Sequence, residues 1–491
     1  MKVQAIDWAL VAAPTVLAVG AIVVLLVDAF TGPPRTRRAA LVPAALTVTA
    51  VVVAAVPAAA LWGEVRTTFC LGRSDALCSF GVNGLTLTFW GVVLFGTAVV
   101  ALIGTVEVAD GRTPQGEWYF LLLCSATGAL TIAAARDLVT LVVALEVVSL
   151  PAFAMAGLRR GDRRAAEAAV KFFLVSVVST AVTLMGISLV YGAVGDVFLV
   201  SLNVGPLDQS LEVVARVGLL LTVVGLAFKV AAVPFHMWVP DTYVGAPVAV
   251  AAYLSVVSKS AGFVGLLLVL QGGLPWLADV WAPLLGVLAA LTMTVGNVMA
   301  LRQGHAIRLL AWSSVAQAGY ILVPFAAGAD DPVPSVTATM GYLAIYAFVN
   351  LSAFAVAAVV GTRYPAQRLE DYRGLVRDEP GAGWPLAFAL LALAGLPPGV
   401  VGLVAKVLVF DAAAGPATWL AVVMAVNVAI GLVYYARWLR ELFRPAPEGA
   451  SRYDVPNGVG VAIGLTFTAG LVFSVLPGLL LDPVLSSLTV P

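Results

Sequence analysis

Five charged residues lie inside long apolar segments of this 491-residue chain: Glu146, Lys171, Lys229, Lys259 and Lys406. A charge at the middle of a bilayer costs roughly 2.5 kcal/mol or more, so such residues usually mark an ion or proton pathway. Each of the five falls in a different apolar segment. Burial disfavours the charged form of a lysine, whereas a nearby carboxylate stabilises that form. Moving the carboxylate can therefore make the lysine take up or release a proton. These residue types therefore predict proton transfer within a membrane.

Two of the lysines accompany prolines that interrupt an apolar helix. Pro234 follows Lys229 by five residues, and Pro397 and Pro398 precede Lys406. Proline removes a backbone donor and clashes with the preceding turn, so each helix is expected to break there. Broken membrane helices free carbonyl groups and admit water, and transporters build ion sites in this way. The alternative for Lys229 is a permanently paired, structural lysine.

The other three charged positions differ in depth. Lys259 lies about twelve residues into its segment, hence ~18 Å deep at 1.5 Å per residue. Its flanking serines could supply a hydrated pathway or serve only helix packing. Glu146 is the only acid deep in an apolar segment and is the expected switchable partner of a lysine. Lys171 is shallower and follows Glu167 by one turn, so a surface ion pair is the alternative for it.

The chain has two histidines, His236 and His305. His236 follows the break at Pro234 and could relay protons near neutral pH or cap the freed carbonyls. His305 lies between two arginines near a predicted helix end and could line the central pathway or remain at the surface. With three cysteines and no Cys/His cluster of metal-ligand spacing, the sequence predicts no metal, iron–sulfur or haem site.

The composition predicts an all-α polytopic membrane protein. The chain is 61% hydrophobic and 11% charged, with a mean hydropathy of +1.01. A membrane-spanning helix needs ~20 apolar residues. About fourteen segments meet this requirement, and no polar stretch between them is long enough for a redox or nucleotide-binding domain. They are residues 8–30, 39–62, 83–106, 118–134, 138–158, 165–193, 213–238, 247–270, 280–301, 305–328, 335–361, 384–411, 417–439 and 457–481.

The breaks fall in the seventh and twelfth of these segments, five helices apart. An odd number of helices per repeat inverts the topology, so this spacing predicts two inverted five-helix repeats, helices 4–8 and 9–13. The expected organisation is a three-helix N-terminal segment (1–117), a first repeat (118–270), a second repeat (280–440) and a C-terminal helix (441–491).

Basic residues predict the orientation. With the first interhelical loop in the cytoplasm, eighteen of the 27 Lys and Arg residues fall on that side, five on the other and four within the membrane. Both termini then face outward. The loop between Cys70 and Cys78 faces the oxidising side, where a disulfide is favoured and two free thiols are the alternative. Cys124 lies in an apolar helix, where packing is its expected role.

Several segments resemble the antiporter-like (Mrp-type) subunits of respiratory complex I. The resemblance runs from about residue 85 to 440 and is carried by residues 146–151, 164–174, 227–241, 308–320 and 393–398. It implies that Glu146, Lys229, Lys259 and Lys406 form a hydrophilic axis that translocates protons, with Lys171 as the lysine of helix 6. The family often has a basic residue at 307, Tyr at 312 and His at 317, where this chain has Ile307, Trp312 and Gln317. The missing histidine leaves open whether Gln317 or His305 serves the middle of the axis.

The resemblance also implies a setting for the chain. It would be a membrane-arm subunit of an NADH–quinone oxidoreductase in the bacterial inner (plasma) membrane. FMN, iron–sulfur clusters and quinone would bind to other subunits, with no cofactor in this chain. Expected partners are a second antiporter-like subunit, small membrane subunits and the lipid bilayer, but no nucleic acid. The alternatives are an Mrp-type cation/proton antiporter subunit and a non-conducting scaffold.

Overall fold

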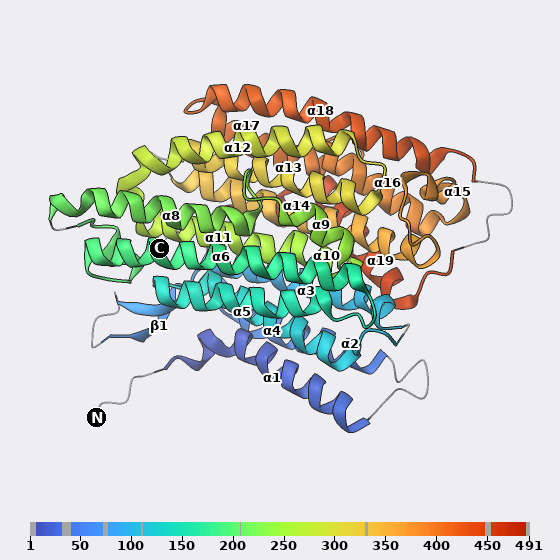
Figure 1. Cartoon of the computed structure of the whole chain (residues 1–491), viewed down its shortest axis with the longest axis horizontal. Helices are drawn as coiled ribbons and strands as arrows, with labels where there is room; N and C mark the ends of the chain where they lie inside the picture. The colour runs from blue at the N-terminus through green and yellow to red at the C-terminus, as the bar shows by residue number, and fades with distance from the viewer. Residues whose placement is uncertain are drawn as a thin grey trace.

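The computed structural model describes residues 6–31, 41–71, 77–109, 111–206, 208–328, 332–446 and 453–487. Within these residues thirteen helical stretches are long and apolar enough to cross a membrane. Their axes run roughly along one direction, with α1 and α18 on opposite sides of the bundle (Figure 1). The prediction of an all-α polytopic membrane protein is confirmed.

The spanning stretches agree with the predicted segments. They are α1 (Trp8–Thr31), α2 (Val42–Ala60), α3 (Gly84–Val108), α4 (Gln115–Ala134), α5 (Leu138–Gly157), α6 (Arg163–Val194), α8 (Glu212–Val230), the composite stretch Val248–Gly273, α12 (Ala278–Leu301), α13 (Ala306–Ala327), α14 (Pro332–Arg363), α18 (Thr418–Phe443) and α19 (Asn457–Val475). The composite stretch consists of α10 (Val248–Tyr253), η3 (Leu254–Ser258), α11 (Lys259–Leu267) and η4 (Leu268–Gly273). The remaining predicted span, 384–411, is divided into α16 (Pro380–Ala394) and α17 (Val400–Ala414).

Both predicted helix breaks are present. α8 ends at Val230, Ala231 adopts the left-handed conformation, and α9 (Trp238–Gly245) begins after Pro234. α16 ends at Ala394, and Gly395 is left-handed with φ of 83°. The peptide bonds before Pro234 and Pro398 are cis. A further irregularity was not predicted: η3 is a π-helical turn that ends directly before Lys259.

Three spanning stretches form the buried centre of the bundle. α13, α14 and the composite Val248–Gly273 stretch are almost completely buried, whereas only about a third or less of α1, α2, α6 and α19 is buried. The exposed residues of these outer helices are largely apolar, as lipid contact requires. The polar side chains carried by the central stretches, including Lys259, are therefore surrounded by protein on every side.

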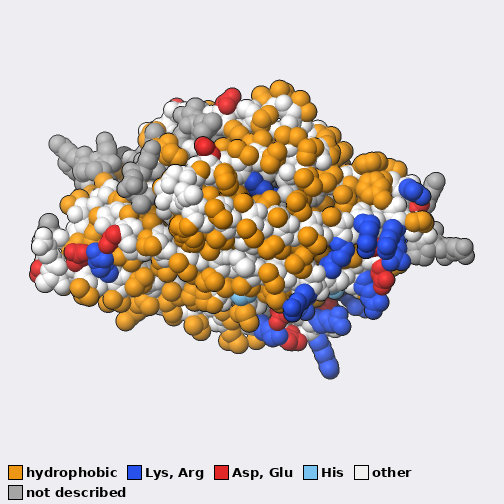
Figure 2. All heavy atoms as spheres, turned by 90° about the horizontal axis from the view of Figure 1, so that it is seen from above, with side chains coloured by type: hydrophobic (Ala, Val, Ile, Leu, Met, Phe, Trp, Pro, Cys, Tyr) orange, Lys and Arg blue, Asp and Glu red, His pale blue; other side chains and the backbone are white. Residues whose placement is uncertain are grey.

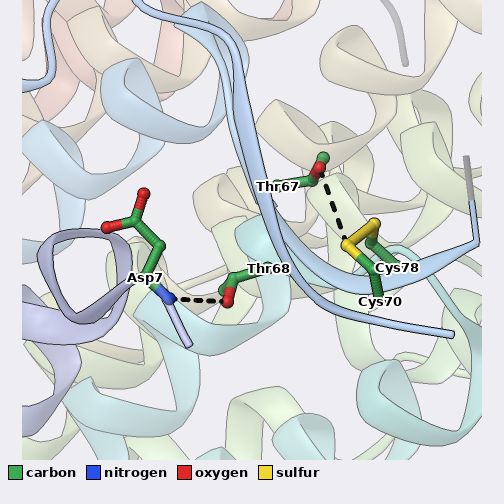
Figure 3. Close-up of a disulfide and its surroundings, with 5 residues drawn as sticks. All are labelled: Asp7, Thr67, Thr68, Cys70 and Cys78. Atoms are coloured by element: carbon green, nitrogen blue, oxygen red, sulfur yellow. Dashed lines mark hydrogen bonds between the residues drawn. A yellow bond between two sulfur atoms is a disulfide. The ribbon is translucent and has the colours of Figure 1, made fainter. Parts of the chain in front are cut away.

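Charge is distributed unevenly along the bundle. Most lysine and arginine side chains visible on the face seen in Figure 2 gather at the end where Figure 1 shows α15 (Leu375–Asp378). A two-stranded hairpin, β1 (Arg66–Cys70) and β2 (Cys78–Val82), lies at the opposite end. A disulfide joins Cys70 to Cys78, and the Thr68 hydroxyl accepts a hydrogen bond from the Asp7 amide at 3.0 Å (Figure 3).

Candidate functional site

Glu146 and Lys229 face each other between α5 and α8. The Lys229 Nζ atom lies 3.6 Å from Oε1 of Glu146 and donates hydrogen bonds to the hydroxyls of Ser149 (2.7 Å) and Ser176 (3.0 Å). The same Glu146 oxygen accepts a hydrogen bond from Thr180 at 2.6 Å. The Lys229 side chain is 11% exposed and that of Glu146 26%. The ammonium thus keeps two hydroxyl acceptors even if the carboxylate moves away.

The break in α8 positions this lysine. Lys229 occupies the last turn of α8, and the carbonyl of the preceding Phe228 accepts a hydrogen bond from the Trp238 indole of α9 at 3.1 Å. The amide of Val233 donates to the Thr292 hydroxyl of α12 at 2.9 Å. Because neighbouring side chains bind these backbone groups, the interrupted segment can lie inside the bundle without unsatisfied donors or acceptors at these positions.

His236 lies in the same interrupted segment and is buried. Its ring centroid is 5.4 Å from that of Trp312, and its Nδ1 atom has no hydrogen-bond partner within the described part of the chain. Its two possible roles, relaying protons and capping the carbonyls freed by the break, both stay predictions.

Lys259 lies at the centre of the bundle and is 2% exposed. Its Nζ atom donates to the carbonyl oxygen of Ser314 at 2.7 Å and to the hydroxyl of the same residue. Among the described residues it has no carboxylate partner. Gly262, one turn further along α11, packs against Lys229, since an added Cβ would lie 3.0 Å from the Lys229 Cβ. Helices α8 and α11 therefore contact each other closely at their lysines.

Lys406 lies beyond the second break, in α17, and is 6% exposed. Its Nζ atom donates to the Leu393 carbonyl of α16 at 2.5 Å. This carbonyl belongs to the last turn of α16, where the break removes helical partners. Gly395 allows the approach: it is left-handed, and an added Cβ would lie 3.1 Å from the Lys406 Nζ atom.

Side chains of α13, α14 and α18 connect the surroundings of Lys259 and Lys406. The Ser313 hydroxyl, next to the Lys259 acceptor Ser314, lies 2.5 Å from the Tyr435 hydroxyl. The Gln317 amide donates to this tyrosine oxygen at 3.2 Å and lies 3.5 Å from the Leu393 carbonyl that Lys406 also contacts. Tyr342 donates to Oε1 of Gln317 at 2.5 Å. These groups form a polar network that reaches the Leu393 carbonyl at Lys406, and its member Ser313 is the sequence neighbour of Ser314, the acceptor of Lys259.

Sequence reasoning missed three members of this polar network: Ser313, Tyr342 and Tyr435. Each lies in a long apolar helix and none carries a formal charge, so the charge-based search passed over them. Gln317 was noted only as the place where a histidine is missing. The structure shows that its amide occupies the junction between the two tyrosines and the broken helix.

The remaining predicted residues, Lys171 and His305, lie apart from this polar network. Lys171 is half exposed, 2.7 Å from Glu167 and 3.6 Å from Asp241, which is the surface arrangement weighed as its alternative. His305 caps α13, its Nδ1 accepting from the Arg308 amide at 3.4 Å. Partial burial together with Arg308 and Arg164 lowers the pKa of His305. Among the described residues, no hydrogen bond joins it to Gln317.

Comparison with known proteins decides the family. The family described as NADH:quinone oxidoreductase/Mrp antiporter, TM, matches residues 135–431. The chain belongs to this family. Within it, NADH-quinone oxidoreductase subunit N 2 of Streptomyces griseus is 51% identical, with 97% of this chain and 92% of that protein covered. NADH-quinone oxidoreductase subunit N of Salinispora tropica is 47% identical, with 78% and 76% covered.

Solved structures of the family show the same fold. A chain of respiratory complex I from Thermus thermophilus with bound aureothin has a TM-score of 0.78 and 31% identity, with 96% of this chain and 98% of that chain covered. A chain of the Mrp complex from Dietzia has a TM-score of 0.79 at 20% identity, with coverage of 97% and 96%, a likeness of fold alone. The predicted resemblance to antiporter-like subunits is confirmed.

The described residues offer no alternative metal chemistry. No group of three or more His, Cys, Asp and Glu residues in the described part of the chain is placed to hold a metal ion. The groups around the three buried lysines are the carboxylate of Glu146, hydroxyls of serine, threonine and tyrosine, and the amide of Gln317. Such groups can hold, donate and accept protons.

Proposed function

We infer that this chain is the proton-translocating subunit N of the membrane arm of a respiratory NADH–quinone oxidoreductase. One observation carries the assignment at the level of chemistry: this family member buries three lysines, one of them paired with Glu146, and polar side chains lie between the other two. The chain is also 51% identical to a subunit N over 97% of its length. Charges inside a membrane are costly and usually mark an ion or proton pathway. The chain contributes to the oxidoreductase as its proton-translocating part.

We propose that Glu146 controls the proton on Lys229. While the carboxylate lies beside the ammonium, the protonated lysine is stabilised. If Glu146 moves toward a cation on an adjacent subunit, a charged lysine is left in a buried site, an arrangement that costs ~3–5 kcal/mol when a buried pair is broken. The hydroxyls of Ser149 and Ser176 still accept hydrogen bonds from the lysine. Lys229 then releases its proton toward Lys259.

From Lys259 the proposed route follows the hydroxyl groups. Ser313 and Tyr435 can each donate and accept, so a proton can pass through them and through water between them. The Gln317 amide is not a titrating group, and its proposed role is to orient Tyr435 and Tyr342. Lys406 then receives the proton at the second break. Gln317 in this way replaces the family histidine as a positioning residue, and His305 has no part in the central route.

We also propose where the subunit lies in the complex and in the membrane. FMN, iron–sulfur clusters and quinone bind to other subunits, and a second antiporter-like subunit and small membrane subunits are the neighbours. The arginine-rich end lies in the cytoplasm of a bacterial cell, and both termini face outward from the plasma membrane. Residues 118–270 and 280–440 form the two inverted repeats. The matching helix breaks support this division.

The Mrp-type antiporter is less well supported. Its structural likeness rests on 20% identity, whereas the subunit N relative from Streptomyces griseus is 51% identical over nearly the whole chain. A non-conducting scaffold would use its lysines only for packing. In a scaffold, replacing a buried lysine would impair assembly of the complex but not the pumping rate of the complexes that assemble.

The test is Lys229→Ala in the purified, assembled complex reconstituted into proteoliposomes. We expect quinone reduction and proton pumping to fall together, on the order of tenfold or more, because removing a proton-transfer group typically costs at least that. Arg216→Ala is the matched control: it removes a cation from the same helix, but one in exposed ion pairs with Glu212 and Asp279. Full pumping by an assembled Lys229→Ala complex would rule out the proposal.

A further inference from the structure

An open cleft of about 560 Å³ lies at the arginine-rich end of the bundle, and Lys229, Lys259 and Lys406 are not among its lining residues. This volume falls within the ~300–1,000 Å³ typical of ligand sites. The side chains that matter for its chemistry are His305, Arg368, Arg373, Arg437, Arg440 and Glu441. We call it the arginine cleft. It has no part in the proposed proton route.

Three segments form the walls of the arginine cleft, and hydrogen bonds fix them together. The turn between α12 and α13 pairs with the loop after α14, since Leu369 N donates to Gly304 O at 2.9 Å and Ala306 N to Gln367 O at 2.7 Å. Arg437 of α18 donates to the carbonyl of Leu301 at 2.9 Å and to that of Gln303. The cleft is therefore held in shape by backbone contacts.

The charges in and beside the cleft do not balance. Glu441 is only 8% exposed, and it lies 2.8 Å from Arg373, 3.0 Å from Arg444 and 3.4 Å from Arg440. Arg368 lies 3.4 Å from Glu370. Four guanidinium groups line the cleft, those of Arg368, Arg373, Arg437 and Arg440, against two carboxylates, those of Glu370 and Glu441. Beside the cleft, Arg444 and Asp371 add one charge of each sign. This surplus favours an additional anion, and guanidinium groups bind phosphate oxygens through paired hydrogen bonds.

The position of the cleft indicates a phosphate attached to a lipid. Val422, Val426 and Val433 are exposed and lie one or two helical turns apart, on one side of α18. Arg440, two turns beyond Val433, lies on the same side and lines the cleft. Trp384 and Phe443, both partly exposed, contact edge to face at 5.7 Å near the same end of α18. Exposed tryptophan residues such as Trp384 are enriched at the membrane–water interface. Figure 2 shows the apolar surface adjoining the basic end.

We propose that the arginine cleft binds the phosphodiester headgroup of an anionic phospholipid whose acyl chains lie along the exposed side of α18. Basic pockets between membrane helices are suited to such headgroups. The guanidinium groups supply the charge and the hydrogen bonds, and the valines of α18 supply an apolar surface for the chains. A free phosphate would use the first feature and leave the second unused.

The experiment uses the assembled complex in phosphatidylcholine nanodiscs and a phosphatidylglycerol analogue that carries a diazirine on one acyl chain. After irradiation, mass spectrometry locates the labelled peptides. We expect saturable labelling of α18 that unlabelled phosphatidylglycerol displaces. Arg368→Gln/Arg440→Gln removes the two most exposed guanidinium groups of the cleft and should raise the half-saturating probe concentration roughly fivefold per arginine, the factor for about 1 kcal/mol each.

Matched controls make the result specific. Arg163→Gln/Arg377→Gln removes the same charge from exposed positions outside the cleft and should label as the unchanged protein does. If the glutamine variant assembles poorly, Arg368→Lys/Arg440→Lys keeps the charge and should retain saturable labelling. Equal, unsaturable labelling by a phosphatidylcholine analogue would overturn the proposal. So would loss of labelling in millimolar inorganic phosphate, which would identify a free-phosphate site, or equal loss in the control variant.

Discussion

Replacing Glu146 by Gln tests the carboxylate that controls Lys229. Gln keeps the shape of the side chain and an oxygen that can accept from Thr180, but it removes the charge. At 3.6 Å and an effective dielectric constant of about 20, two unit charges attract by ~4.6 kcal/mol. Solvent reaches part of Glu146, and two serine hydroxyls still hold the lysine, so about 2 kcal/mol is a reasonable net loss.

A loss of about 2 kcal/mol corresponds to a roughly 30-fold weaker proton-binding constant of Lys229. We therefore expect quinone reduction and proton pumping by the assembled Glu146→Gln complex to fall together by a factor of this order. The assay compares NADH oxidation and acidification of proteoliposomes for equal amounts of complex. Pumping at the unchanged rate would show that the carboxylate does not control the lysine, and the reasoning from the 3.6 Å contact would be wrong.

Glu167→Gln is the matched control for this substitution. It makes the same chemical change one helix away, in an ion pair with Lys171 whose two side chains are 64% and 51% exposed. Exposed pairs of this kind contribute ~0–1 kcal/mol. Turnover should therefore change by less than about fivefold. A loss as large as that of Glu146→Gln would assign the effect to a general change of charge.

Three further outcomes are expected. Lys406→Ala should lower pumping as Lys229→Ala does, measured in the same proteoliposomes, and an unchanged rate would remove the second break from the route. Tyr435→Phe should slow proton transfer, because it deletes the hydroxyl between Ser313 and Gln317; Tyr434→Phe, which alters a contact with Asn297 instead, should not, and equal effects would contradict the route. Peptide mass spectrometry without reductant should find Cys70 bridged to Cys78, and alkylation of both thiols would refute the bridge.

The features that sequence analysis could predict are local ones. A lysine in an apolar segment and a proline a few residues away are visible in the sequence, so the breaks near Lys229 and Lys406 were predicted and are present. A lysine partner for Glu146 was expected because each charge is costly alone, and the structure places Lys229 beside it. Here the type of residue and its depth were sufficient.

Features that depend on the rotation of a helix about its axis could not be predicted from the sequence. Whether Tyr435 or its neighbour Tyr434 faces Gln317 depends on how α18 packs against α13, and the apolar pattern of α18 does not specify it. The π-helical turn before Lys259 shifts the rotation of that helix as well. For Lys171 the sequence left two arrangements open, and the packing of α6 against α9 places it at the surface beside Asp241.

The carbonyl of Leu393 offers a way to observe the second lysine without altering it. Lys406 donates to this backbone oxygen at 2.5 Å, and the same oxygen lies 3.5 Å from the Gln317 amide. A hydrogen bond from a charged donor is roughly twice as strong as one from a neutral donor. Loss of the Lys406 proton would therefore raise the stretching frequency of this one carbonyl. With ¹³C placed in the carbonyl of Leu393 alone, infrared difference spectra of the working complex should show this one band shift each time Lys406 gains or loses its proton.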